Sequence, residues 1–575
     1  MGGSCMENAA TPPCGHQPGW YALTSVAIAA LTGMMPLVAF AAGPPPSAGT
    51  ILQQSAPPPQ APSAPKSVVK LPAPQNQTSQ SSIPIPVKNV RLKGNTLLSD
   101  AELAPLIKPI EGQTVKLARL QKVAQRIGDA YHRHGYPLAY AFIPAQSVRR
   151  GVVTIRIVEP RFDRIELHNQ AELNPGLARR TLGVYAGQTI RGEPLHRGLL
   201  LLGRTPGVRV GGTFVPGTRP ATSSLDVNLA NAGLFSGSVT EDNYGNPSTG
   251  RARTSASLTL ANPLGFGSQL ALNGLVTQND RLHSGGVLFV SPNIWNGLRF
   301  GAYASRTHYR LGGHFSALDQ HGHATQVGLD LSYPIVLQPE RLLTARLDVL
   351  RDGFETKTLS VGADRQSHIL LGRLTLSGAR VESWGGVTTA GLSLTRGRLS
   401  LDSAGARVAG PGPSARGGFW IGHLRLAQRA PLPLGLNLHL SVSGQISSTN
   451  LDGSQKFYLG GPYGVMSYPV SYAGGDQGVL ARGRLAHALP IPTWAGRLDL
   501  AALLQGGTVW VNRHNYSGYS GRSRITLGGA GAGLNYHWRS NVRARVAYVH
   551  TINRDRGAPG LAYGGEIWAS LQIQF

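Results

Sequence analysis

The last ten residues of the chain, Glu566 to Phe575, read EIWASLQIQF. Apolar side chains take every second position: Ile567, Ala569, Leu571, Ile573 and Phe575. The positions between them carry Trp568, Ser570, Gln572 and Gln574. Because successive side chains of a strand point to opposite faces, this period of two predicts a strand with one apolar face and one more polar face.

The same alternation extends back to about residue 233, in segments of about ten residues separated by Gly, Pro, Asn and Asp. Examples are Thr344–Leu350, Gly422–Arg429 and Asn541–Val549. About sixteen such segments in roughly 340 residues leave about 21 residues for each strand and its connection, which suits tilted membrane-spanning strands. The sequence therefore predicts a mainly β fold, with a 16-stranded transmembrane β-barrel over residues 231–575.

The alternation also predicts which face of the barrel wall points inward. In Asn541–Val549 the apolar residues share one face, while Arg543 and Arg545 share the other. Arg425 and Arg429 lie opposite the leucines of their own segment in the same way. An arginine that faces lipid at mid-membrane costs about 2–4 kcal/mol, so we expect these four to line a wet, basic lumen.

Composition narrows the classes of function. Charged residues make up 14% of the 575 residues, there are 74 glycines, and the formal net charge is +26. The basic residues are dispersed through alternating segments and form no patch or arm, so a nucleic-acid partner is not expected. Acidic surface lipid or a basic channel wall fits better. The sequence has no nucleophile elbow, phosphate loop or Cys/His metal spacing, so we expect no enzyme, catalytic residue, metal or cofactor.

The N-terminal region reads as a leader followed by a linker. An apolar run, Tyr21–Phe40, ends at the small-x-small sequence Ala39-Phe40-Ala41, which predicts a signal peptide over residues 1–41. Both cysteines, Cys5 and Cys14, fall within it, so no disulfide is expected in the mature chain. Residues 42–86 are rich in Pro, Gln and Ser and predict an extended linker.

Two small α+β domains follow the linker. In residues 87–160, a capping box at Ser99 opens a short helix, and a second helix carries an apolar face from Leu120 to Tyr131. With strands at 87–92, 138–143 and 152–158, the predicted order is β-α-α-β-β. Residues 161–230 repeat this order more loosely.

Several motifs together resemble the TpsB transporters of two-partner secretion, the haemolysin-activator type, over about residues 85–575. The motifs of the first small domain, which resemble the family's POTRA domain, are Gly94-Asn95-Thr96, Gly135-Tyr136-Pro137, Ile143-Pro144-Ala145-Gln146 and Glu159. Those that resemble its barrel are Asp242-Asn243-Tyr244-Gly245, Thr249-Gly250, Phe457 to Val465, and Gly475-Asp476-x-Gly478.

The resemblance implies two periplasmic POTRA domains (87–160 and 161–230) and an outer-membrane barrel. It implies export of a large unfolded TpsA-like exoprotein that the POTRA domains recognise, without nucleotide hydrolysis. The final strand, with Trp568, Leu571, Ile573 and Phe575, resembles the targeting signal read by the barrel-assembly machinery. We further expect outer-membrane lipid around a single copy of the chain. A BamA-like assembly factor and a passive porin are the alternatives.

The resemblance also implies a long loop, about 450–478, that folds back into the barrel. In the family its tip carries an arginine that meets an acidic residue of the barrel wall. Here the tip reads Gly464-Val465-Met466-Ser467-Tyr468, and the matching wall motif aligns with Leu503, Gln505 and Gly507. Both charges are therefore replaced, by Met466 and Gln505. Losing both is nearly neutral, whereas one buried charge without its partner would cost about 3–5 kcal/mol.

The family often has a plug helix near its N-terminus. Residues Ile51–Ser55 are a short run among prolines, so we expect no plug helix here.

Partner-binding candidates lie in the POTRA region. The residues offered by motif or charge are Lys116, Arg119, Lys122, Arg126, Gly135, Tyr136, Pro137, Pro144 and Gln146. The four basic ones share a face that either binds an acidic segment or is merely solvated. The strands at 138–143 and 208–215 either offer open edges to an extended peptide or are covered.

Overall fold

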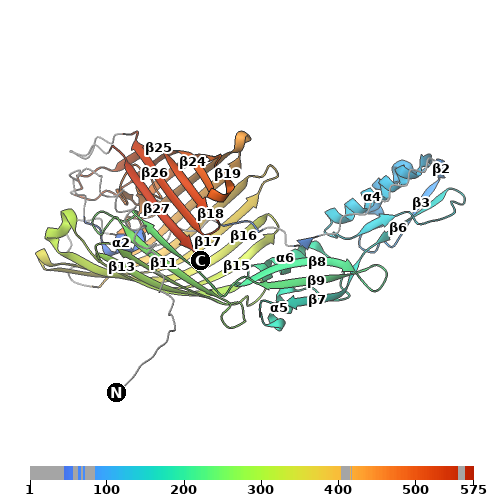
Figure 1. The fold of residues 1–575 in the computed structure, drawn as a ribbon, viewed down its shortest axis with the longest axis horizontal. Coiled ribbons are helices and arrows are strands. Elements are labelled where there is room, and N and C mark those ends of the chain that lie inside the picture. Colours follow the sequence, from blue (N-terminus) through green and yellow to red (C-terminus); the bar gives the residue numbers. More distant parts are fainter. Residues whose placement is uncertain are drawn as a thin grey trace, which may run out of the picture.

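The computed structural model describes residues 45–55, 62–65, 69–70, 84–402, 415, 417–517, 519–553 and 564–575. The predicted signal peptide, 1–41, lies outside these residues. Figure 1 shows a barrel at one end of the molecule and two small domains extending from its rim. Among the residues that the structure describes, no helix is long and apolar enough to cross a membrane.

The predicted 16-stranded barrel is confirmed. Antiparallel neighbours run in chain order from β10 to β20 and from β23 to β27, and β27 pairs with β10 to close the cylinder. The first strands are β10 (Phe235–Asp242), β11 (Arg253–Ala261), β12 (Gln269–Thr277), β13 (Leu282–Val290), β14 (Arg299–Arg310), β15 (Gln320–Gln338), β16 (Arg341–Thr358) and β17 (Ala363–Val381). The others are β18 (Val387–Leu401), β19 (Gly417–Pro431), β20 (Leu436–Ser447), β23 (Gln477–Leu489), β24 (Arg497–Trp510), β25 (Arg524–Trp538), β26 (Val542–Thr551) and β27 (Glu566–Gln574).

The two faces of the barrel wall follow the predicted period. In β26, Ala547 and Val549 are buried inside, whereas Val546 and Tyr548 are about half exposed on the outside. Arg543 and Arg545 therefore lie on the lumen side of this strand, as the alternation predicts. Exposed leucines and valines outside form the apolar band that a lipid-facing wall requires.

The first small domain has two strands more than the sequence predicted. Its elements are β2 (Pro84–Val87), β3 (Asn89–Lys93), α3 (Asp100–Ile107), η1 (Lys108–Ile110), β4 (Gln113–Lys116), α4 (Leu117–Arg133), β5 (Tyr140–Phe142) and β6 (Val152–Val158). β2 and β4 form a two-stranded sheet of their own, and β3, β6 and β5 form the main one. The prolines of β2 hid this strand, because Pro is tolerated only at the edge of a sheet. The predicted capping box is present, with the Ser99 and Glu102 side chains each accepting from the other's backbone N–H.

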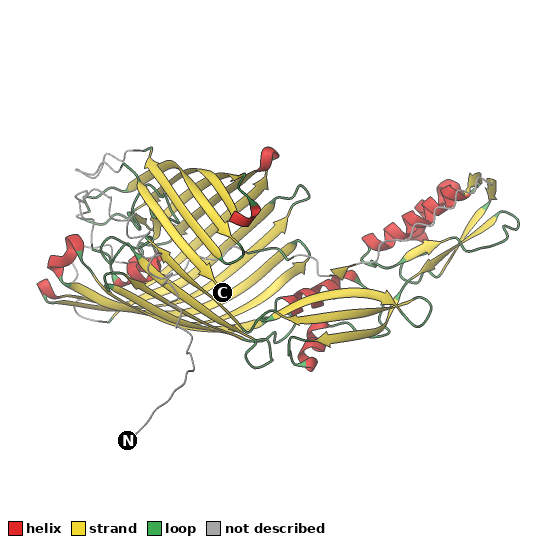
Figure 2. Cartoon of the chain, viewed as in Figure 1, coloured by secondary structure: helices red, strands yellow, loops and turns green. Residues whose placement is uncertain are grey.

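The second small domain has the predicted order of elements. They are β7 (Arg161–Asn169), α5 (Pro175–Leu182), α6 (Gly192–Gly203), β8 (Val208–Pro216) and β9 (Thr222–Asn231). Its sheet gains a member from the linker, because β1 (Val69–Lys70) pairs in parallel with Gly212 and Thr213 of β8. Figure 2 shows the helices of this domain on one face of the sheet, next to the barrel rim.

A short helix, α2 (Ala48–Ser55), lies within the barrel, which corrects the expectation that no plug helix exists. Ala48, Ile51 and Leu52 are buried in one cluster with lumen residues such as Leu350 and Ile369. Isolated helices this short are unstable in water, so the helix depends on its packing against the wall. The prediction failed because it weighed length and neighbouring prolines only.

Candidate functional site

The loop between β20 and β23 folds back into the barrel. Two short strands, β21 (Phe457–Leu459) and β22 (Ala473–Gly475), pair with each other and form its stem. Beyond the stem, Val465, Met466, Ser467 and Tyr468 are all at most 3% exposed. A buried loop needs partners for its backbone groups, and the barrel wall supplies them.

Met466 is the centre of the contact between loop tip and wall. Its backbone N–H donates to Gln505 Oε1 at 2.6 Å, and its carbonyl oxygen accepts from Trp568 Nε1 at 2.6 Å. Its sulfur lies 3.7 Å from Arg545 Nη2. Methionine thus sits where the family's arginine is expected, and the glutamine that replaces the wall acid touches it directly.

The remaining tip residues bind the neighbouring wall strands. Ser467 Oγ donates to the Gly528 carbonyl at 3.2 Å, and Tyr468 OH donates to the Asn553 carbonyl at 2.7 Å. Gly464 is packed so tightly that a Cβ would lie 2.6 Å from the Gly460 carbonyl oxygen. Met466, Ser467 and Tyr468 therefore dock the tip on the wall, and Gly464 allows the close packing within the loop.

The wall motif lies opposite the tip. Leu503 packs in the same apolar cluster as Met466. At Gly507, a Cβ would come within 2.7 Å of Leu459 in the loop stem, so only glycine leaves room there. The docked tip rests on neutral hydrogen bonds and apolar packing, with no ion pair among the described tip residues.

A buried carboxylate fixes the base of the loop. Asp476 has no exposed surface. It accepts hydrogen bonds from the backbone N–H groups of Leu451 and Arg513 at 3.0 and 2.8 Å, and from Lys456 Nζ at 2.8 Å. This explains the Asp of the Gly475-Asp476-x-Gly478 motif, because an unpaired buried charge would be costly.

The helix α2 and the loop contact each other inside the barrel. Thr50 Oγ1 lies 3.1 Å from Tyr458 OH, and Gln53 Nε2 donates to the Lys456 carbonyl at 3.0 Å. On the wall side, Ser55 Oγ lies 3.5 Å from Thr307 Oγ1. The lumen is therefore filled by two segments that are held by each other as well as by the wall.

In the first small domain, Glu159 joins the motifs that the sequence had separated. It accepts from the backbone N–H groups of Thr96 and Leu97, from the Thr96 hydroxyl and from Tyr131 OH. Partial burial opposes ionisation, but the hydrogen bonds outweigh it, so the pKa of Glu159 lies below its ordinary value. The ionised carboxylate thus ties the turn after β3 to helix α4.

The Gly135-Tyr136-Pro137 motif lies where the two small domains meet. The Gly135 carbonyl accepts from the Gly192 N–H at 2.9 Å, and a Cβ on Gly192 would lie 3.6 Å from Pro137. The rings of Tyr136 and Tyr131 are tilted against each other, with their centres 6.1 Å apart. Gly135 and Pro137 therefore contact the second domain, whereas Tyr136 packs within the first domain.

The Pro144–Gln146 motif shapes the turn before β6. Gln146 makes two hydrogen bonds of 2.8 Å with the backbone of Thr154, and Pro144 is half-buried. The hydrogen bonds of Gln146 with this strand give it a structural role.

The basic face of α4 is fully available to a partner. Lys116, Arg119, Lys122 and Arg126 are all exposed and form no ion pair with a residue that the structure describes. The nearby β5 is an edge strand, and it carries the exposed aromatic pair Tyr140 and Phe142, whose rings lie 6.0 Å apart.

The second proposed edge, β8, is covered by β1 over two residues. Of the two alternatives for this strand, an open edge or a covered one, the covered edge is supported at Gly212 and Thr213. The linker strand β1 covers it.

The final strand closes the barrel. Phe575 and Gly237 exchange two backbone hydrogen bonds of 2.9 and 3.0 Å, and Leu571 pairs with Glu241 of β10. Ile573 and Phe575 are exposed on the outside. Trp568 is 1% exposed on the inside, where it meets the loop tip. Sequence reasoning missed this contact, although a large aromatic with an N–H donor on a lumen face signals a buried partner.

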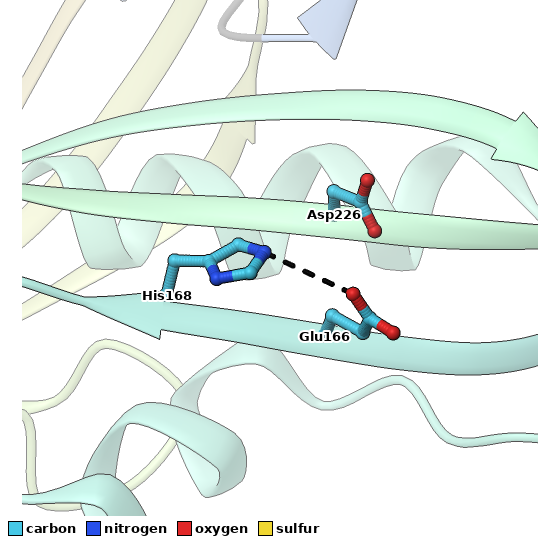
Figure 3. A group of neighbouring side chains, drawn as sticks. All are labelled: Glu166, His168 and Asp226. Carbon is cyan, nitrogen blue, oxygen red and sulfur yellow. Dashed lines mark ion pairs between the residues drawn. The ribbon is translucent and has the colours of Figure 1, made fainter.

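Figure 3 shows the only group of potential metal ligands found in the described part of the chain, Glu166, His168 and Asp226. It lies on the exposed face of the second domain's sheet, and Arg164 already pairs with Glu166 at 2.8 Å. This competing cation makes the group a solvated polar face.

Comparisons with known proteins agree with this architecture. Residues 85–160 match the POTRA domain, ShlB-type, and residues 221–536 match the family described as haemolysin secretion/activation protein ShlB/FhaC/HecB. The chain belongs to the ShlB/FhaC/HecB family. It is an outer-membrane transporter of two-partner secretion, with its POTRA domains in the periplasm.

Among similar proteins, the heme/hemopexin transporter protein HuxB of Haemophilus influenzae (strain 86-028NP) is 25% identical over 84% of this chain and 86% of its own length. The outer membrane transporter CdiB of Dickeya dadantii is 25% identical over 75% of this chain and 77% of its own length. The solved structure of CdiB from Escherichia coli has a TM-score of 0.69 at 21% identity, covering 88% of this chain and 93% of that one. That likeness supports the fold.

Proposed function

We propose that this ShlB/FhaC/HecB-family protein exports one large, unfolded TpsA-like exoprotein through its lumen after α2 and loop 450–478 have moved aside. The observation that carries the proposal is how the lumen is filled. Both segments are part of this chain. Between the points where they join the rest of the chain, they are held by packing and individual hydrogen bonds. These contacts can be exchanged without breaking a covalent bond. A passive porin needs an open lumen, so this filling disfavours that alternative.

The POTRA domains would receive the substrate. The exposed aromatic pair on edge strand β5 suits an extended segment that adds a strand and places alternate apolar side chains on Tyr140 and Phe142. The basic face of α4 favours acidic residues in the same segment. We take 87–160 and 161–230 as the two receiving domains and 231–575 as the pore.

Export of this kind requires no catalytic residue, metal or cofactor of the chain. We propose that a single copy acts, surrounded by outer-membrane lipid and inserted by the barrel-assembly machinery through its last strand. A BamA-like assembly role would require the barrel wall to receive other proteins. Whether secretion requires α2 to leave the lumen tests the transport role directly.

The test locks α2 with a disulfide. Both cysteines of the chain precede residue 42, so a Ser55→Cys, Thr307→Cys pair would be the only thiols if the leader is removed. Their oxygens lie 3.5 Å apart, within reach of a disulfide after a small adjustment. We expect secretion of the exoprotein encoded by the neighbouring gene to stop when the cysteine pair is oxidised and to return on reduction.

Each single cysteine variant is the matched control and should secrete normally under both conditions. Unchanged secretion by the oxidised pair, with the disulfide confirmed by mass spectrometry, would show that α2 does not leave the lumen.

A further inference from the structure

The outer wall of the barrel carries a group of arginines that the lumen does not use. They are Arg306 and Arg310 on β14, Arg351 on β16, and Arg396 and Arg398 on β18. All five are exposed. We call these five residues the outer arginine sector.

Their neighbours in the chain show that they face outward. Thr307 and Tyr309, which lie between Arg306 and Arg310 in the sequence, are buried against the lumen contents. Leu350 and Leu399 belong to the same buried cluster as α2. Since successive side chains of a strand point to opposite faces, the arginines next to these buried residues point away from the lumen.

The sector lies at the end of the barrel away from the POTRA domains. Arg197 of α6 binds Asn296, just before β14, and the Pro334 carbonyl of β15, which marks this end of the wall as periplasmic. β14 starts at Arg299 and ends at Arg310, so Arg306 and Arg310 lie near its outer end.

Along β16 and β18, the outward-facing side chains change from apolar to basic toward the end of the barrel away from the POTRA domains. On β16, the outward residues Leu347 and Val349 are 47% and 50% exposed, and Arg351 follows two positions later. On β18, Leu392 and Leu394 are 55% and 51% exposed and precede Arg396. The arginines therefore sit immediately above the apolar band, at the level of lipid head groups.

Four other strands that run in the same direction, β12, β20, β24 and β26, differ from this pattern. Their corresponding outer positions are apolar or aromatic, with Val276, Ile446, Trp510 and Tyr548 between 41% and 68% exposed. A general surface charge would be spread around the cylinder.

None of the five arginines forms an ion pair with a residue that the structure describes. The Glu355 carboxylate is close enough to Arg306 for an electrostatic interaction, but its ion pairs are with Lys357 at 2.8 Å and His323 at 3.7 Å. Arg396 lies 5.1 Å from the ring centre of Trp420, which holds it at the outer surface. Arg351 and Arg398 both lie in register with Leu370, so their strands are about 10 Å apart.

We propose that the outer arginine sector binds a phosphorylated, acylated glycolipid of the outer leaflet, of the lipid A type. Its phosphates would meet the arginines, and its acyl chains would lie along Leu347, Val349, Leu392 and Leu394. Guanidinium groups bind phosphate through paired hydrogen bonds, and an apolar surface directly below them distinguishes an acylated ligand from a soluble anion. The inference rests on the outer-membrane location and is independent of the export step.

The experiment uses the full chain in detergent, with fluorescent diphosphorylated lipid A as the probe. The variant combines Arg306→Gln, Arg351→Gln and Arg398→Gln, and Arg341→Gln is the control because it removes an exposed arginine at the periplasmic end of β16. An arginine near an anionic lipid surface is worth about fivefold in binding, so the triple variant should bind at least about tenfold more weakly. The control should bind as the parent does.

Dephosphorylated lipid A and inorganic phosphate are the comparison probes. The proposal requires that the parent prefer the diphosphorylated lipid and that millimolar phosphate not replace it. Equal binding by parent and triple variant would overturn it, as would equal binding of both lipids by the parent or full displacement by phosphate. Heat-modifiable gel mobility of every variant shows that the barrel is folded, and secretion assays report export separately.

Discussion

Restoring the missing charges at the loop tip tests how the tip is held. Met466 is 1% exposed, and its sulfur lies 3.7 Å from the Arg545 guanidinium. Met466→Arg would place a second cation beside Arg545, in an apolar cluster. One unpaired buried charge costs about 3–5 kcal/mol, and water in the lumen reduces this to about 1–3 kcal/mol.

Gln505→Asp should be milder. An aspartate could still accept from the Met466 N–H, which now donates to Gln505 at 2.6 Å, and Arg545 is a nearby cation. We expect the free energy of unfolding to fall by about 1 kcal/mol or less. A hydrogen bond to a charged group replaces a neutral one, but the shorter aspartate side chain has to span a longer distance. In the double variant the new Arg and Asp can pair, so its loss should be smaller than the sum.

The assay is a double-mutant cycle on thermal stability, with secretion of the exoprotein measured in parallel. A coupling of about 1 kcal/mol or more is expected, because the two positions are in direct contact. Strictly additive losses would refute the reasoning, since they would mean that the tip does not dock at Gln505.

Three further predictions concern other parts of the chain. Glu159→Gln should destabilise the first POTRA domain by about 1–3 kcal/mol, measured as faster hydrogen exchange at Thr96 and Leu97. Because the pKa of Glu159 is lowered from 4.5, its contribution is present above that pH and is lost as the pH falls through the lower folded-state value; the variant should lack this dependence, and an unchanged acid response would contradict the assignment. Asp476→Asn should weaken secretion and increase proteolysis of the loop, because Lys456 loses its anion; normal protease resistance would count against this role. Phe575→Ala should lower the amount of folded barrel in the outer membrane severalfold, judged by heat-modifiable mobility, and undiminished abundance would show that closure by β27 does not need this side chain.

The local patterns of the sequence were sufficient to predict the barrel. Period-two alternation is a property of each strand alone, so the strands and their inward faces could be predicted without knowing their neighbours. Met466 and Gln505 were identified through the resemblance to the TpsB family, whose tip and wall motifs align with these positions. Capping and helical periodicity predicted the helices of the small domains in the same way.

Contacts between distant segments were beyond sequence reasoning. Helix α2 has eight residues and is stabilised by a lumen built from strands more than 200 residues away. The Trp568 bond to Met466 spans 102 positions, and β1 has two residues whose strand conformation depends on the edge of β8. The outer arginine sector likewise depends on the antiparallel pairing of β14 to β18, because three strands separate the strand of Arg306 from the strand of Arg398. Short segments have too little local free energy to choose a conformation, so the tertiary structure chose it for them.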